Sequence, residues 1–302
     1  MKSWLLMLFL GVVQSLGVVH AAVPEPLLWQ ARGDAGTVYL LGSFHMLTVD
    51  DYPLDPRVEA AYARADRLVF EVDPAEMAAP QTLQAVQALG QFSEGNNLRQ
   101  VLSASTYAKL RLHLGNDEAL QAVENFKPWH LSMALAVGSM AAMGLEARLG
   151  LDQHFMQRAA EDGKPSSGLE TALDQIGALD RAPLAEQDYM LAEALEPLAD
   201  KRERILQMHT LWRAGDASGL ERAIQTDLGV NTPQAYRLLN RDRNQAWLPQ
   251  IQALLTQPET TLVVVGSMHL LGRDGLVELL RERGITVERV QLRVLMPLDE
   301  AA

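Results

Sequence analysis

The chain has 302 residues, of which 48% are hydrophobic, so it can bury a sizeable core as one large domain or two small ones. Its formal net charge of −12 argues against nucleic acid or anionic lipid as the main partner. The absence of cysteine excludes disulfides, thiolate metal ligands and a cysteine nucleophile, although a domain of this size can be exported without disulfides.

The N-terminus has the pattern of a cleaved signal peptide. Lys2 precedes a mostly apolar stretch at residues 4–19, and the small residues Ala21 and Ala22 follow it. This stretch is short for a spanning helix, and polar residues interrupt it. We therefore predict a signal peptide at residues 1–22, cleaved after Ala21 or Ala22. The mature protein is expected to be periplasmic or extracellular and to keep no stable membrane span.

Three segments near the start of the mature chain have the pattern of strands. Residues 27–32 and 37–41 flank a Gly-Asp-Ala-Gly turn, which predicts a hairpin. A short helix at 57–65 then leads to a third strand at 67–72 (RLVFEV). These strands would deliver His45 and Glu71 at their ends.

From about residue 74 to residue 257 the pattern is mainly helical, with one short strand at 166–169 that leads to Glu170. The segment 131–145 is rich in Met and Ala and carries no charge. It predicts a buried helix or, alternatively, a helix whose methionines line an apolar binding groove. The predicted helices are 98–114, 118–126, 128–143, 151–161, 171–179, 185–214 and 232–255.

The chain closes with a compact strand-helix-strand pattern at 261–265, 274–284 and 285–290. Strands therefore come from both chain ends and are expected to pair across the helical middle. The predicted fold is α/β (α+β), with a central mixed β-sheet and a large helical middle insertion. Residues 23–302 are expected to form a single domain.

A short sequence occurs twice, as VYLLGSFHMLTVD at 38–50 and LVVVGSMHLLGRD at 262–274. Each copy is an apolar run followed by Gly-Ser-x-His, with Asp five residues after the histidine. His45 and His269 would then stand at equivalent places past two strand ends, on the carboxyl edge where α/β sheets build their sites. One histidine alone would more often be structural, but a matched pair predicts a shared metal or substrate site.

Four further residues are candidates for chemistry. Glu71 could be a third metal ligand or a general base, and Glu170 is a second carboxylate at a strand-to-helix junction. Arg243 and Asn244 lie upstream of the second histidine strand. They could bind a substrate carboxylate or carbonyl oxygen, although charged helical faces are usually solvated.

Other polar residues have plainer interpretations. Asp152 either caps a helix or points into the crevice, Asp73 caps a helix, and His154 is structural. Ser43 and Ser267 follow glycines but lack a triad context, so a serine nucleophile is not expected.

The ordered set of these residues resembles the TraB/GumN family, also called the PrgY or TIKI-like family, over residues 27–290. The matching positions are Gly42, Ser43, His45, Pro53, Leu54, Phe70, Glu71, Asp73, Gly150, Asp152, Leu169, Glu170, Thr171, Gln175, Arg243, Asn244, Val264, Gly266, Ser267, His269, Leu270, Gly272 and Gly275. The resemblance implies an α/β fold with a helical insertion and a metal-dependent hydrolase. Animal members of the wider family look like membrane-associated metalloproteases that use manganese- or cobalt-type ions. Other members are linked to inhibition of peptide pheromones, and distant relatives of the fold bind haem.

We therefore expect a metal-dependent hydrolase, a peptidase acting on a peptide or protein. His45, His269 and Glu71 would bind a divalent manganese, cobalt or zinc ion, and Glu71, Glu170, Arg243 and Asn244 would be catalytic. The alternatives are a non-catalytic protein that binds haem, metal or peptide on the same fold, or a scaffold whose histidines only hold turns.

Overall fold

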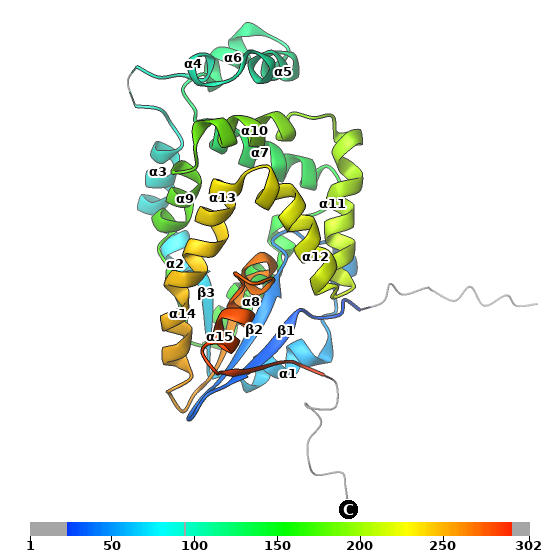
Figure 1. Cartoon of the computed structure of the whole chain (residues 1–302), viewed down its shortest axis with the longest axis vertical. Helices are drawn as coiled ribbons and strands as arrows, with labels where there is room; N and C mark the ends of the chain where they lie inside the picture. Colours follow the sequence, from blue (N-terminus) through cyan, green and yellow to red (C-terminus); the bar gives the residue numbers. More distant parts are fainter. Residues whose placement is uncertain (1–22, 94, 292–302) are drawn as a thin grey trace, which may run out of the picture.

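The structure, a computed structural model, describes residues 23–93 and 95–291, so the predicted signal peptide lies outside the described residues. A six-stranded mixed sheet of order β4-β3-β5-β2-β1-β6 forms its centre (Figure 1). The strands are β1 (Leu28–Arg32), β2 (Thr37–Ser43), β3 (Arg67–Val72), β4 (Ser166–Glu170), β5 (Thr260–Gly266) and β6 (Thr286–Arg289). Strands from both chain ends pair within this sheet, with β5 between β3 and β2 and β6 beside β1, which confirms the predicted fold class.

The four strands β4, β3, β5 and β2 run parallel, and β1 pairs antiparallel with both β2 and β6. Every residue of β2 and β5 after the first is buried, as expected for parallel strands that are covered on both faces. The predicted hairpin of β1 and β2 closes at Gly33, whose N–H donates to the carbonyl of Gly36 at 3.0 Å. The closing β6 does not pair with β5, because β2 and β1 lie between them.

Helices cover the sheet and extend beyond the carboxyl ends of its parallel strands (Figure 1). Their bounds are α1 (Pro56–Arg64), α2 (Pro74–Met77), α3 (Pro80–Leu89), α4 (Leu98–Val101), α5 (Ala104–Leu114), α6 (Asp117–Val123), α7 (Pro128–Ala141), α8 (Leu151–Asp162), α9 (Ala172–Asp180), α10 (Leu184–Ala194), α11 (Leu198–Arg213), α12 (Ala217–Ile224), α13 (Pro233–Tyr236), α14 (Asp242–Leu254) and α15 (Leu276–Glu282). Within the described ranges, no helix is long and apolar enough to cross a membrane.

The helical region has a small core of its own, apart from the large core that surrounds the sheet. It lies among α4, α5, α6 and α10, which Figure 1 shows at the end of the molecule farthest from the sheet. Its buried residues are Leu98, Leu102, Leu110, Leu120, Leu191 and Leu195. The insertion therefore buries apolar surface independently of the strands that carry the candidate site.

Two helices predicted as continuous are broken, so those predictions are wrong. The segment 98–114 divides into α4 and α5, because Ser103 leaves the helical conformation and its Oγ accepts the N–H of Thr106 as an N-cap. The segment 185–214 divides into α10 and α11 at Pro197, which has no N–H to continue a helix. The predicted helix 232–255 is one helical run, but residues 237–241 form a π-helical segment between α13 and α14.

The prediction that the uncharged segment 131–145 forms a buried helix is also wrong. In α7 only Pro128, Trp129 and Ser132 are buried, whereas the side chains of Met133 and Val137 are 38% and 46% exposed. Helix α7 packs against α10, which leaves much of its apolar surface uncovered. The alternative interpretation, a methionine-lined groove, is therefore the one to consider for this helix.

Candidate functional site

All six residues predicted for the site lie at the carboxyl edge of the parallel strands. His45 follows β2, Glu71 lies near the end of β3, and Glu170 is the last residue of β4. His269 lies in a 3₁₀ turn directly after β5, and α14 brings its second and third residues, Arg243 and Asn244, against that turn. The sheet and α14 therefore gather these side chains from five separate segments of the sequence.

Glu71 is the central carboxylate of the cluster. Its Oε1 accepts the backbone N–H of Gly266 at 2.7 Å, and its Oε2 accepts from Gln175 at 2.8 Å and from Arg243 at 2.6 Å. Burial by itself opposes ionisation, but the surrounding cationic groups, with Arg243 in direct contact, hold the pKa of Glu71 well below its usual range. Glu71 is therefore a permanent carboxylate at neutral pH.

His45 is oriented by a carboxylate from α8. Its Nδ1 lies 3.1 Å from Oδ1 of Asp152, and the same oxygen accepts the hydroxyl of Ser43 at 2.7 Å. Asp152 therefore points into the crevice, and α8 begins at Gly150 without a side-chain cap. Desolvation lowers the pKa of His45, but the hydrogen bond to Asp152 and the charges of Asp152 and Glu71 outweigh it and raise that pKa above its ordinary value.

The other ring nitrogen of His45 faces Glu71 across Gly266. A Cβ at position 266 would lie 3.1 Å from Nε2 of His45 and 3.2 Å from Oε1 of Glu71, so both atoms border the space that the glycine leaves open. This space belongs to a pocket of about 220 Å³ that Asp152 and Gln175 also line. The His45 side chain is 61% exposed, so Nε2 can meet a ligand from solvent.

His269 lies behind this pocket and is 2% exposed. Its Nδ1 lies 2.7 Å from Oδ1 of Asn244, and its Nε2 lies 3.0 Å from Nη1 of Arg243. Because a guanidinium can only donate, Nε2 accepts and Nδ1 carries the proton. Desolvation lowers the pKa of His269 to about 3, so the ring is neutral at pH 7 and both of its nitrogens are used within the protein.

Arg243 joins the two glutamates to this histidine. Its Nε and Nη2 donate to Oε1 of Glu170 at 2.9 and 2.5 Å, and Nη2 also donates to Glu71. Its Nη1 donates to the carbonyl of Leu239 at 2.9 Å and to His269. These contacts use all five N–H groups of the guanidinium, so Arg243 holds the cluster together rather than offering a donor to a substrate.

Glu170 and Asn244 complete the buried layer. Burial raises the pKa of Glu170 despite its contact with Arg243, and its Oε2 accepts from the indole of Trp247 at 3.3 Å. Asn244 is fully buried, and its Nδ2 donates to the carbonyl oxygens of His269 and Asp274 at 3.2 and 2.7 Å. Neither residue lines the pocket that His45 borders.

The two Gly-Ser-x-His copies are not structurally equivalent, contrary to expectation. In the parallel pairing of β2 with β5, Ser43 lies opposite Gly266 and Gly42 opposite Val265, so the copies are out of step by one residue. Because side chains alternate between the faces of a strand, this offset sends matching residues to opposite faces. One histidine consequently reaches the pocket, whereas the other is enclosed.

The predicted divalent ion fits this donor set only in part. Nε2 of His45 is backed by a carboxylate on Nδ1, the arrangement that orients metal-binding histidines, and Oε1 of Glu71 lies beside it. His269 offers no free nitrogen while Arg243 donates to it. In the part of the chain that the structure describes, no group of three or more His, Asp or Glu residues is arranged to hold a metal ion.

Sequence reasoning left three residues of this site unassigned or undecided. Asp152 had two interpretations, Gln175 matched the family pattern without a role, and Trp247 gave no signal. Trp247 contacts both Arg243 and His269, with the guanidinium carbon 4.6 Å from its ring and the tilted imidazole ring 4.5 Å away between centroids. A tryptophan on an amphipathic helix predicts only packing, so no sequence pattern could have placed it here.

The plainer interpretations agree with the structure. Asp73 caps α2 by accepting the N–H of Ala75 at 2.8 Å, and His154 packs against the ring of Tyr52 at 5.1 Å. Ser43 donates to Asp152, and Ser267 donates to the carbonyl of Ser43 at 2.8 Å. Neither hydroxyl contacts a histidine base, so the arrangement is not that of a serine nucleophile.

The chain was compared with known proteins. The family model described as TraB/PrgY/gumN matches residues 27–289. The chain is 27% identical over 244 residues to the protein called "Uncharacterized protein YbaP" in Escherichia coli (strain K12) and in Shigella flexneri, which covers 80% of this chain and 87% of each relative. An uncharacterized protein of Treponema pallidum (strain Nichols) is 23% identical over 274 residues, which covers 86% of this chain and 81% of that protein. No solved structure matches the chain.

Proposed function

Because the chain belongs to the TraB/PrgY/gumN family, we propose that it is a hydrolase that acts on a peptide or protein at the pocket beside His45. The observation that carries the proposal is the pairing of His45 with Asp152, which leaves Nε2 free beside a permanently ionised Glu71. A carboxylate-backed imidazole at a solvent-open pocket is suited to moving a proton to or from a reacting group. The substrate class rests on the family resemblance.

The proposed hydrolysis begins with a water molecule in the space beside Gly266, between Nε2 of His45 and Oε1 of Glu71. Because the pKa of His45 is raised, its Nε2 acts as a base only in the molecules whose imidazolium has already lost a proton to solvent. In that form Nε2 takes a proton from this water as the water oxygen attacks the carbonyl carbon of the substrate. Asp152 stabilises the imidazolium through Nδ1, and the same proton then passes to the leaving amine. The second N–H of the Gln175 amide, which Glu71 does not use, is a donor for the substrate carbonyl oxygen.

Glu71 is better suited to be a ligand than a base. A carboxylate whose pKa lies well below its usual range binds a proton too weakly to act as a base at neutral pH. We propose, as the alternative to His45 acting as the base, a metal-bound form in which Glu71 and Nε2 of His45 would hold a divalent ion (manganese, cobalt or zinc), which would polarise the substrate carbonyl and make a bound water more acidic. His269, predicted as a ligand, serves here with Glu170, Arg243 and Asn244 to position Glu71.

The experiment measures hydrolysis of a fluorogenic peptide library and metal-dependent shifts of the melting temperature on the mature chain. We expect His45→Ala and Gly266→Ala to abolish both signals, because the first removes the ring nitrogen that serves as base or as metal ligand and the second fills the space between Nε2 and Oε1. Matched controls are His113→Ala on exposed α5 and Gly138→Ala on α7, where an added Cβ meets no atom within 4 Å.

Two outcomes would contradict this proposal. If His45→Ala hydrolyses peptides as fast as the wild type, the reactive centre lies elsewhere. If the wild type binds metal or peptide but cleaves nothing in the library, the non-catalytic alternative replaces the hydrolase. A haem ligated by both histidines is the weaker version of that alternative, because His269 would have to give up its contact with Arg243.

We also propose that the protein is exported and that residues 1–22 are removed. The supporting observation is the charged, apolar and small-residue pattern of this segment. Expression of the full chain in a bacterium with a periplasm, followed by mass spectrometry of the periplasmic fraction, should give a mature N-terminus at Ala22 or Val23. A protein that stays in the cytoplasm with Met1 intact would contradict export.

A further inference from the structure

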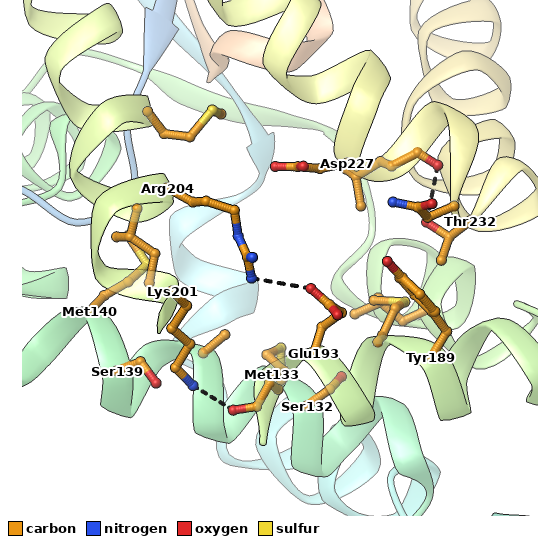
Figure 2. A pocket seen from close by; sticks show the side chains of 18 residues that line it. Ser132, Met133, Ser139, Met140, Tyr189, Glu193, Lys201, Arg204, Asp227 and Thr232 are labelled. Atoms are coloured by element: carbon orange, nitrogen blue, oxygen red, sulfur yellow. Dashed lines mark hydrogen bonds and ion pairs between the residues drawn. The ribbon is translucent and has the colours of Figure 1, made fainter. Parts of the chain in front are cut away.

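A second cavity, of about 440 Å³, lies in the helical region apart from the candidate site (Figure 2). It is open on one side and is bordered by α7, α10, α11 and the π-helical segment Gln225–Val230, and it shares no lining residue with the pocket beside His45. Its size falls in the range of small-molecule sites, which is about 300 to 1,000 Å³. Five flexible or branched apolar side chains dominate its wall: Met133, Met140, Met190, Ile205 and Met208.

The serine and threonine hydroxyl groups in this wall are already used. Ser132, Ser139 and Thr232 donate to backbone carbonyls three or four residues earlier, at 2.9, 2.7 and 3.1 Å. A peptide in the cavity would bury backbone carbonyls that these hydroxyls cannot satisfy, and each unpaired buried group is costly. An acyl chain has no such groups, and methionine walls adapt to its flexible shape.

One cation lies inside this apolar wall. Lys201 is only 8% exposed, and its Nζ donates to the carbonyl of Ala194. In residues 23–93 and 95–291 no carboxylate lies within ion-pairing distance of that Nζ. A buried ammonium without a carboxylate in contact is unfavourable, and burial lowers the pKa of Lys201, although the charge of Glu196, beyond ion-pairing distance, opposes part of this shift.

The other charges around the cavity lie at its rim. Arg204 reaches toward Glu193, with Nη2 3.1 Å from Oε2, and these side chains are 50% and 44% exposed (Figure 2). Asp227 lines the opening and is exposed as well. Solvent screens these rim charges, so Lys201 is the charge that an occupant of the cavity would meet without competition from water.

We propose that this cavity binds a long-chain fatty acid, with its carboxylate on Nζ of Lys201 and its acyl chain along the methionines. The carboxylate supplies the counter-charge that Lys201 lacks, and the chain covers the apolar surface of α7 that the fold leaves exposed. The net charge of −12 disfavours an anionic membrane surface, but a single carboxylate inside the cavity meets the local ammonium instead. This site does not depend on the proposed hydrolysis.

The test is a titration of the mature protein with palmitate, read by displacement of a fluorescent fatty acid and by calorimetry. We expect saturable binding by the wild type. Ala136→Trp, which fills the cavity from α7, should abolish it, whereas Ala141→Trp, exposed on the same helix outside the cavity, should bind like the wild type. Lys201→Met should weaken palmitate binding about tenfold, since it removes one charged hydrogen-bonding partner, and should leave binding of 1-hexadecanol, which has no carboxylate, unchanged.

Four results would overturn the proposal. The first is a wild type without saturable palmitate binding. The second is an Ala136→Trp variant that binds as the wild type does, which would place the ligand elsewhere. The third is a Lys201→Met variant that keeps both its melting temperature and its palmitate affinity, which would remove the role of the ammonium. Displacement of the probe by an apolar peptide with a higher affinity than palmitate would also reject the fatty acid.

Discussion

His269 illustrates how burial and one hydrogen bond fix a protonation state. The Arg243 guanidinium donates to Nε2, so protonating that nitrogen would break the contact and place two cations side by side. With a pKa lowered to about 3, the folded ring stays neutral where the unfolded ring would charge. Its contribution to stability is therefore complete above pH 6.5 and is lost as the pH falls from 6.5 toward 3.

We accordingly predict that nitrogen NMR of histidine-labelled protein will show His269 as the neutral Nδ1–H tautomer throughout pH 5–8. The exposed ring of His113 supplies a reference signal from a histidine in contact with water. Arg243→Met removes the donor to Nε2 and should bring the titration of His269 into a higher pH range. A protonated His269 in the wild type at pH 5 would contradict the hydrogen-bond assignment.

For single residues, the sequence identified most of the site residues but not the residues that each of them contacts. The candidate residues could be named because each follows an apolar run that ends at the same sheet edge. The pairing of His45 with Asp152 spans 107 positions, and nothing in either local pattern specifies it. The opposite environments of His45 and His269 follow from a one-residue strand offset, which two nearly identical sequences cannot show.

Helix α9 connects the insertion with the site, because it carries the Gln175 amide that contacts Glu71. Thr171 begins this helix with a capping box, in which its Oγ1 accepts the N–H of Asp174 at 3.1 Å. We predict that Thr171→Ala lowers the free energy of unfolding by about 1 kcal/mol, since it removes the N-cap. It should also lower the rate of any hydrolysis, since the first turn positions Gln175.

Denaturant unfolding of the purified variants measures this effect. Thr210→Ala is the matched control, because Thr210 is exposed within α11 and only donates back to the carbonyl of Leu206. Its effect should stay below about 0.5 kcal/mol. Equal losses of unfolding free energy in Thr171→Ala and Thr210→Ala would contradict the stabilising role of the N-cap of α9.

The elements themselves were largely predictable. All six strands were found within two residues of their ends, because apolar runs bounded by turn residues are a strong signal. The misplaced elements share a cause: Ser103 and Pro197 interrupt helices whose amphipathic pattern continues across them. The composition of α7 predicted burial, but composition cannot tell a helix covered by neighbours from one that borders a cavity.

Across the whole molecule, the loop that carries His45 is fastened to α11 through a buried carboxylate. Asp51 is fully buried and contacts Nε2 of His209 at 3.0 Å and the guanidinium of Arg213. Although burial opposes ionisation, the hydrogen bonds from His209 and Thr48 lower the pKa of Asp51 to about 2. The sign of the shift means that this link stabilises the fold above pH 4 and is lost as the pH falls through 2.

We predict that this link contributes about 2 kcal/mol to the free energy of unfolding at neutral pH, as the shift from 3.8 to about 2 implies. Between pH 5 and 2 the free energy of unfolding of Asp51→Asn should fall less with decreasing pH than that of the wild type. The neighbouring Asp50→Asn is the control, because that side chain is exposed and should change stability by less than about 0.5 kcal/mol. Identical acid profiles for the wild type and Asp51→Asn would refute the assignment.

Helix α11 contacts a different functional region at each of its ends. Its first half lines the methionine-walled cavity through Lys201 and Ile205, and its last turns hold the Asp51 loop through His209 and Arg213. Because α11 is one continuous helix, we expect a displacement at one of these regions to move the other. Sequence change in α11 is therefore doubly constrained during evolution: a substitution that suits the cavity is retained only if the far end still keeps the histidine loop in place.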